Sequence, residues 1–158
     1  MTTLGVTVDD VRAFVAPLPR SYEVLVRDRV KFRVGQIVYV AFSRDETLMG
    51  FARVTPYSDR PFYAGVGEHT VYVDAAARGQ GLGRRLLDEL AAESERRGLY
   101  KLTSRIFTTN APSRAVHRAA GFQEVGVKRR HGRLDGEWKD CVLVERLLGE
   151  AADDDERP

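Results

Sequence analysis

The feature that constrains this chain most is a glycine-rich turn between an apolar strand and an amphipathic helix. Val71, Tyr72 and Val73 form a β-branched and aromatic run that is typical of a buried strand. Glycines follow at positions 79, 81 and 83, and leucines at positions 82, 86, 87 and 90 share one helical face. The first N–H groups of such a helix have no internal partner, so the pattern predicts a cradle for a phosphate or pyrophosphate.

The residues after the turn distinguish between the kinds of phosphate-binding loop. A dinucleotide-binding fingerprint needs a third glycine where Leu86 stands, and a P-loop needs Gly-Lys-Ser/Thr where residues 83–85 read Gly-Arg-Arg. Both loops are excluded, and the pattern that remains is Arg78-x-x-Gly81-x-Gly83. We expect a side chain at Gly81 or Gly83 to enter the space of a bound pyrophosphate.

This pattern resembles the Gln/Arg-x-x-Gly-x-Gly/Ala motif of the GCN5-related N-acetyltransferase superfamily, in which the loop binds the pyrophosphate of acetyl-CoA. Other segments, in matching order, resemble the phosphinothricin N-acetyltransferase branch, whose members acetylate the α-amino group of amino acids and their analogues. The resemblance covers about residues 49–148 and implies an α/β acetyltransferase fold, a mixed sheet flanked by helices. The segments that carry it are residues 67–73, 110–113, His117, 121–122 and 136–140.

The resemblance also implies which residues contact acetyl-CoA. The strand before the turn would offer backbone N–H groups to the thioester oxygen and pair with the pantetheine arm, the turn would hold the pyrophosphate, and Asn110 would bond the arm while capping its helix. The implied cofactor-binding residues are Val71, Tyr72, Val73, Arg78, Gly79, Gln80, Gly81, Leu82, Gly83, Arg84, Asn110 and Ser113.

Acetyl transfer to an amine needs a neutral nucleophile, a stabilised oxyanion and a leaving thiolate that can be protonated. Glu68 stands at the position of the family's proposed general base, although a lone glutamate at a strand edge is otherwise usually a solvated surface residue. His117 stands where many acetyltransferases have a tyrosine that protonates the thiolate; histidine can do that work or can pack against the cofactor. We expect His69 to be structural or to line the pocket, because neighbours on a strand point to opposite faces.

Composition limits the partners. The length of 158 residues fits one α/β domain, and a formal net charge of +2 with interspersed signs gives no support for nucleic acid or an anionic membrane. A single cysteine, Cys141, suits a reducing cytoplasm, and no apolar run approaches the roughly 20 residues that cross a bilayer. Residues 1–3 do not resemble a signal peptide. We therefore expect a cytoplasmic protein.

The sequence also gives expectations for bound metal, for the acceptor and for the oligomeric state. The three histidines and the cysteine lack the spacing of metal ligands, so no metal is expected. The expected acceptor is a small-molecule amine. Dimers are common among the relatives, so a homodimer is a further expectation.

The remaining elements follow from periodicity and turn residues. A short helix is predicted for residues 7–15 and strand structure for 22–34. The loop 56–67 is long enough to suggest a function and resembles the family segment that helps to form the acceptor pocket. The other predicted elements are a hairpin of 36–42 and 48–54 around the polar loop 43–47, a helix over 83–97, a parallel strand over 99–107, a helix from Asn110 to Gly121, and a closing hairpin of 122–127 and 138–148 around residues 131–136.

The N-terminal third departs from the family pattern. Residues 1–51 do not resemble the strand and two helices that open the family's domain; residues 11–19 and 30–51 instead resemble the start of a YjbR-type (MmcQ-like) domain, a small module described as DNA-binding. This suggests a recombined chain. We expect a single domain over 1–148, made of an atypical segment 1–51 and a catalytic part 52–148, with a disordered acidic tail at 149–158.

Several functional alternatives stay open. Ser113 and His117 lack a positioned acid and a nucleophile elbow, which argues against a hydrolase. The basic run 128–133 could serve nucleic acid, but in this family it is a solvated strand end, where an arginine could meet an amino acid's carboxylate. The expected activity is N-acetylation of a small amino-acid-like substrate of the phosphinothricin type. The alternatives are acetylation of a protein or peptide amine, and a non-catalytic acetyl-CoA-binding or DNA-associated module.

Overall fold

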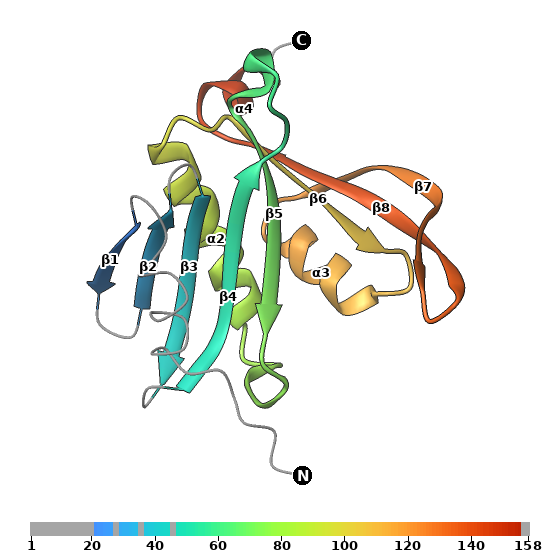
Figure 1. Ribbon diagram of the computed structural model, residues 1–158, viewed down its shortest axis with the longest axis horizontal. Helices are drawn as coiled ribbons and strands as arrows, with labels where there is room; N and C mark the ends of the chain where they lie inside the picture. Colours follow the sequence, from blue (N-terminus) through green and yellow to red (C-terminus); the bar gives the residue numbers. More distant parts are fainter. Residues whose placement is uncertain (1–20, 27–28, 35–36, 45–46, 156–158) are drawn as a thin grey trace.

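The computed structural model describes residues 21–26, 29–34, 37–44 and 47–155 (Figure 1). The strands are β1 (Ser21–Val26), β2 (Arg29–Val34), β3 (Ile37–Arg44), β4 (Thr47–Pro56), β5 (Val66–Val73), β6 (Lys101–Phe107), β7 (Gln123–Leu134) and β8 (Glu137–Leu147). The helices are α2 (Leu82–Arg96), α3 (Ala111–Ala119) and α4 (Glu150–Asp155), and the 3-10 turns are η1 (Pro61–Tyr63) and η2 (Ala75–Ala77).

The described strands form one mixed sheet in the order β1-β2-β3-β4-β5-β6-β8-β7. Every neighbouring pair is antiparallel except β5 and β6, which are parallel and pair only from Val66–Lys101 to Glu68–Thr103. Beyond that point the two strands separate, and Figure 1 shows β6, β8 and β7 diverging from β5 with α3 in the angle between them. The predicted α/β fold, a mixed sheet flanked by helices, is confirmed.

The core lies between the sheet and the leucine face of α2. Leu86, Leu87 and Leu90 are completely buried, and Leu82 is almost so. They pack with apolar side chains of β4, β6 and β8 and with Phe122. The predicted leucine stripe is therefore the face that attaches α2 to the sheet, and this packing holds the glycine-rich turn at the end of β5.

The N-terminal predictions have mixed outcomes. The strand prediction for residues 22–34 is confirmed by β1 and β2, whereas the predicted helix 7–15 lies outside the described residues. The predicted five-residue loop 43–47 is wrong, because β3 continues to Arg44 and β4 already begins at Thr47. A register shift between Phe42 and Ser43 lets the ladder continue through polar residues, whose side chains do not take part in backbone pairing.

The closing hairpin is also longer than predicted. The sequence analysis ended the first strand at Val127 and placed a loop at 131–136, but β7 continues to Leu134 and the connection is only Asp135-Gly136. Both turn residues have positive φ, 51° and 80°, as a two-residue hairpin turn requires. Nearly all side chains of β7 are exposed, so charged residues can lie on this strand without being buried. Their polarity was therefore not a sign of a loop.

The acidic C-terminal segment is the last correction. Residues 150–155 form helix α4 where the sequence analysis expected a disordered tail. Glu150 and Asp153 lie in its first turn, where negative charge interacts favourably with the helix dipole. None of the helices in the described part of the chain is long and apolar enough to span a membrane.

Candidate active site

A groove of about 710 Å³ runs along the turn between β5 and α2 and is bounded on its other side by α3. Nearly all the residues predicted to bind the cofactor line this groove: Val71, Tyr72, Val73, Arg78, Gly79, Gly81, Leu82, Gly83, Arg84, Asn110 and Ser113. Gln80 does not line it; its amide donates to the carbonyl of Ala76. Three segments that are distant in sequence thus meet at one groove.

The N-terminus of α2 opens into the groove without a side-chain cap. Its N-cap is Gly81, with φ 73° and ψ 5°, a left-handed conformation that glycine adopts without strain. An added Cβ at Gly81 would meet no protein atom within 4 Å. The uncapped N–H groups and the cations Arg78 and Arg84 at the groove make this end suited to a phosphate or pyrophosphate, while the valines of β5 and Val116 make the other end apolar.

Gly83 has a different reason to be glycine. An added Cβ there would lie 3.1 Å from Cγ1 of Val116 on α3 and 3.6 Å from Cγ2 of Val73. The absent side chain therefore allows α2 and α3 to approach each other. The expectation that a Gly83 side chain would enter the ligand's space stays a prediction, and the packing between the two helices is a second constraint at this position.

The strand β5 presents an unpaired backbone edge beside the groove. Its pairing with β6 ends at Glu68, so in the described structure residues 69–73 have no strand on that side. Ser104 of β6 donates its hydroxyl to the carbonyl of His69 at 2.9 Å, which bridges the two strands where they separate. An extended ligand could hydrogen-bond to this edge as an added strand does.

Helix α3 begins as predicted and supplies the other wall of the groove. The side chain of Asn110 accepts a hydrogen bond from the N–H of Ser113 at 3.1 Å and caps the helix. Because the cap is made by Oδ1 of Asn110, its amide nitrogen is available to a ligand. The prediction of an Asn110-capped helix is confirmed.

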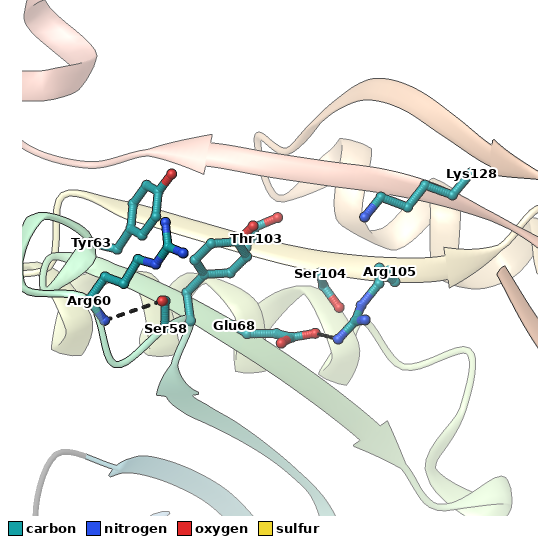
Figure 2. A pocket seen from close by; sticks show the side chains of 9 residues that line it. Ser58, Arg60, Tyr63, Glu68, Thr103, Ser104, Arg105 and Lys128 are labelled. Carbon is teal, nitrogen blue, oxygen red and sulfur yellow. Dashed lines mark hydrogen bonds and ion pairs between the residues drawn. The ribbon is translucent and has the colours of Figure 1, made fainter.

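A second pocket, of about 450 Å³, lies where β5 and β6 separate (Figure 2). Its lining residues come from the loop after β4, from β5, from β6 and from β7: Tyr57, Ser58, Arg60, Tyr63, Glu68, Thr103, Ser104, Arg105 and Lys128. Glu68 is its one carboxylate and faces three cations, Arg60, Arg105 and Lys128. The loop that the sequence analysis expected to contribute to an acceptor pocket is part of this wall.

Glu68 makes an ion pair with Arg105 in this pocket. Oε1 of Glu68 accepts from Nη2 of Arg105, and the dashed line in Figure 2 marks this contact. Both side chains are partly exposed, 30% for Glu68 and 46% for Arg105. The other guanidinium nitrogen, Nη1, lies 3.5 Å from Nε2 of His131 on β7.

His69 and His117 form a buried pair behind the groove. Their Nε2 atoms are 3.0 Å apart, each side chain is only 2% exposed, and both rings contact Phe122. Nδ1 of His117 lies 2.7 Å from the carbonyl of Ser113, which can only accept, so Nδ1 carries the proton. His69 therefore donates through its Nε2 to the bare Nε2 of His117.

Both imidazoles are neutral in this arrangement. Burial, and then the neighbouring His117, lower the pKa of His69 to about 3, against a smaller opposing effect of the Thr103 backbone. Burial also lowers the pKa of His117, opposed by its hydrogen bond to the Ser113 carbonyl. Nδ1 of His69 has no hydrogen-bond partner among the described residues. A charged imidazole would thus be costly here.

The sequence analysis did not identify two of these contacts. Arg105 was not singled out, because nothing in its local sequence indicates that it reaches Glu68. His69 was expected to be structural, and its burial agrees with that, but its hydrogen bond to His117 joins residues 48 positions apart. Among the described residues no group of three or more His, Cys, Asp or Glu side chains is arranged to hold a metal.

Comparison with known sequences identifies close similarities. A phosphinothricin N-acetyltransferase from Alcaligenes faecalis is 37% identical over 111 residues, covering 70% of this chain and 56% of that protein. An L-methionine sulfoximine/L-methionine sulfone acetyltransferase from Pseudomonas aeruginosa is 34% identical, covering 73% of this chain and 67% of that protein. The N-alpha-acetyltransferase RimI of Mycobacterium tuberculosis is 39% identical, covering 71% and 67%.

Solved structures agree with these similarities. A phosphinothricin acetyltransferase from Sinorhizobium meliloti in complex with acetyl-CoA has a TM-score of 0.69 at 30% identity, covering 74% of this chain and 64% of that one. The structure of yncA from Salmonella typhimurium with acetyl-CoA has a TM-score of 0.69 at 28% identity, covering 72% and 66%.

A family model also matches this chain. It describes the acetyltransferase (GNAT) family and matches residues 7–122, which include most of the segment that the sequence analysis set apart as atypical. The resemblance of residues 11–19 and 30–51 to a YjbR-type domain stays a prediction. With the motif, the groove and the sheet that opens beside it, this match shows that the chain belongs to the acetyltransferase (GNAT) family.

Proposed function

We propose that the protein is an N-acetyltransferase that transfers the acetyl group of acetyl-CoA to the α-amino group of a small amino-acid-like substrate. The observation that carries this proposal is the pairing of two sites at one opening in the sheet. The groove along β5 fits the cofactor, and the pocket around Glu68 lies where β5 and β6 begin to separate.

Acetyl-CoA, when bound, supplies an acetyl group on a thioester. The uncapped N-terminus of α2, with Arg78 and Arg84, would hold its pyrophosphate. The backbone edge of residues 69–73 would hold the pantetheine arm as an added strand and offer N–H groups to the thioester oxygen. Asn110 and Ser113 would contact the arm from α3.

Glu68 is the proposed general base. An amino acid arrives as an ammonium ion, and one of its protons must leave before nitrogen has a lone pair for attack. The Glu68 carboxylate takes that proton, directly or through water, and the nitrogen–carbon bond forms. As the carbon–sulfur bond breaks, the nitrogen loses a second proton, which neutralises the leaving thiolate directly or through water. Glu68 is the one carboxylate among the residues that line this pocket, so it is the group there that an ammonium ion can approach.

Two roles were left open for His117, protonation of the leaving thiolate and packing. Its geometry favours packing. Its Nε2 is directed to His69, and the ring does not line the groove. Ser113 lines the groove, whereas His117 does not, so Ser113 would be closer to a ligand bound there. The Ser113 hydroxyl lies 3.4 Å from Nδ1 of His117. We assign His117 the role of holding α3 against β5, which keeps the groove at a fixed width.

The charges of the pocket support an acceptor with acidic groups besides its amine. Arg60, Arg105 and Lys128 outnumber Glu68, so an amino acid with a second anionic group would balance the pocket better than a neutral amine. Phosphinothricin is such a compound, and the Alcaligenes relative is named for its acetylation. The pocket volume of about 450 Å³ is within the usual range of about 300–1,000 Å³ for small-molecule sites.

The RimI relative supports a second candidate, acetylation of a peptide N-terminus. The two candidates predict opposite acceptor preferences. We would measure CoA release with a thiol reagent, offering L-phosphinothricin, L-methionine sulfone, unmodified L-amino acids and short peptides at equal concentration. Preference for the free amino acids supports the proposal, preference for peptides supports the second candidate, and tight acetyl-CoA binding without transfer to any of them overturns both.

A further inference from the structure

Arg105 occupies an unusual place in the acceptor pocket, because it neutralises the residue that has to act as the base. Its guanidinium binds Oε1 of Glu68 on one side and lies 3.5 Å from His131 on the other. It stands on β6 two residues beyond the last position at which β5 and β6 pair. The ion pair therefore spans the opening between the two strands, and both partners line the pocket (Figure 2).

A base in this state receives the acceptor poorly. One of its two carboxylate oxygens, Oε1, is already paired with a guanidinium, and this neighbouring positive charge repels a second cation. The ion pair is nevertheless exchangeable. Both side chains are partly exposed, and ion pairs of that exposure contribute little to stability.

An α-amino acid carries the two charges that such an exchange needs. Its ammonium and carboxylate groups are attached to the same carbon, so one molecule can present a cation to Glu68 and an anion to Arg105. Arginine binds carboxylates through two parallel N–H donors, and its five donors allow the His131 contact to persist. Arg60 and Lys128 then remain for an acidic side chain.

We propose that Arg105 determines acceptor specificity: the carboxylate of an α-amino acid replaces Glu68 as its partner and thereby frees Glu68 to accept the ammonium proton. An amine without a carboxylate has nothing to offer Arg105, so the ion pair persists and Glu68 stays occupied. This inference rests on the proposed function. It assigns the contact with the carboxylate to β6 and not to the basic run 128–133, where the sequence analysis placed it.

The test compares acceptors that differ only in the carboxylate. L-phosphinothricin is paired with 3-aminopropyl(methyl)phosphinic acid, and L-methionine sulfone with 3-(methylsulfonyl)propylamine. The variants are Arg105→Gln, Arg105→Lys and, as a matched control, Arg96→Gln, which removes an exposed arginine paired with Glu93 on α2. kcat and KM are measured for each acceptor, and acetyl-CoA affinity by calorimetry.

We expect wild type and Arg96→Gln to prefer the amino acids. Arg105→Gln should reduce that preference by about tenfold or more, equivalent to about 1.4 kcal/mol, mainly through a higher KM for the amino acid. The amines should be turned over as well as before or better, because Glu68 is no longer paired. Arg105→Lys should retain most of the preference, and acetyl-CoA affinity should not change.

The outcomes separate this inference from the proposed function. If Arg105→Gln lowers turnover of amino acid and amine equally, Arg105 only supports the fold of the pocket and the inference is overturned, while the proposed function stands. If the wild type turns over the amines as well as the amino acids, the inference is overturned as well. If acetyl-CoA binds and neither class is acetylated, the proposed function fails and the inference fails with it.

Discussion

The proposed cofactor groove and the proposed acceptor pocket lie at the same opening in the sheet but are made of different parts. The groove consists largely of backbone and apolar side chains: an uncapped helix end, a free strand edge, and glycine and valine residues. The pocket consists of charged and hydroxyl-bearing side chains from four separate segments. A backbone site needs particular residues at fixed spacing, whereas a side-chain site needs only that suitable residues meet in space.

This difference predicts that the two sites can be damaged separately. Replacing Glu68 by Gln removes the proposed base but nothing that lines the groove. We expect kcat to fall on the order of 10²-fold, the usual effect of losing a general base, with acetyl-CoA affinity unchanged. Steady-state kinetics and titration calorimetry measure these two quantities.

Glu137→Gln is the matched control, because Glu137 also pairs with a cation, Lys139, but is exposed on β8 and outside both sites. It should leave kcat unchanged. If Glu68→Gln kept full activity, Glu68 would be a solvated surface residue and not the general base. The pocket would then not differ from the groove by carrying the catalytic group.

Within the groove, Gly81 and Gly83 are expected to differ in what a side chain at each position would disturb. Gly81→Val should raise the dissociation constant of acetyl-CoA about tenfold or more, about 1.4 kcal/mol, since the new side chain points to open groove space from a left-handed backbone. Gly83→Val should in addition lower the free energy of unfolding by about 1–3 kcal/mol, because it overpacks the contact with Val116.

The second substitution Val116→Ala separates these two causes. Combined with Gly83→Val it should restore much of the stability, and combined with Gly81→Val it should restore none. Unfolding is followed in urea and binding by calorimetry. Equal rescue of both variants would mean that the two glycines have the same role.

The histidine pair behind the groove should make stability depend on pH. Unfolded histidines titrate near pH 6.5, whereas folding lowers the pKa of His69 to about 3 and also lowers that of His117. The folded state then binds fewer protons, so the stability is present above about pH 6.5 and is lost as the pH falls below it. We expect the free energy of unfolding to drop by roughly 1–2.5 kcal/mol between pH 7 and pH 5.5, with His69 alone contributing about 1.3 kcal/mol.

His69→Gln tests the source of that drop. Glutamine can still donate to Nε2 of His117 but does not titrate, so the loss between pH 7 and pH 5.5 should decrease by at least half. His131→Gln is the control, because that histidine is exposed and does not belong to the buried pair. An undiminished loss in His69→Gln would show that other groups cause the acid sensitivity.

The predictions made from sequence succeeded where the local pattern has a backbone cause. The leucine stripe, the Asn110 cap and the glycine-rich turn each depend on residues close in sequence, and all three are present in the structure. The length of β7 was underestimated because pairing with β8 depends on backbone groups, whatever the charge of residues 128–134. The contact between Gly83 and Val116 was not predicted, because Val116 is on another helix.

The sequence by itself determined the family, the order of the central elements and most of the residues that line the groove, because an anion site at a helix N-terminus requires glycines at defined positions. Only the tertiary structure decided how Glu68 is occupied. Its partner Arg105 is 37 residues away, and the two meet because β5 and β6 pair for three positions and then separate. The same applies to His69 and His117, whose hydrogen bond and neutral state depend on α3 packing against β5 around Phe122. Contacts of this kind depend on where the sheet opens, and no short stretch of sequence contains that information.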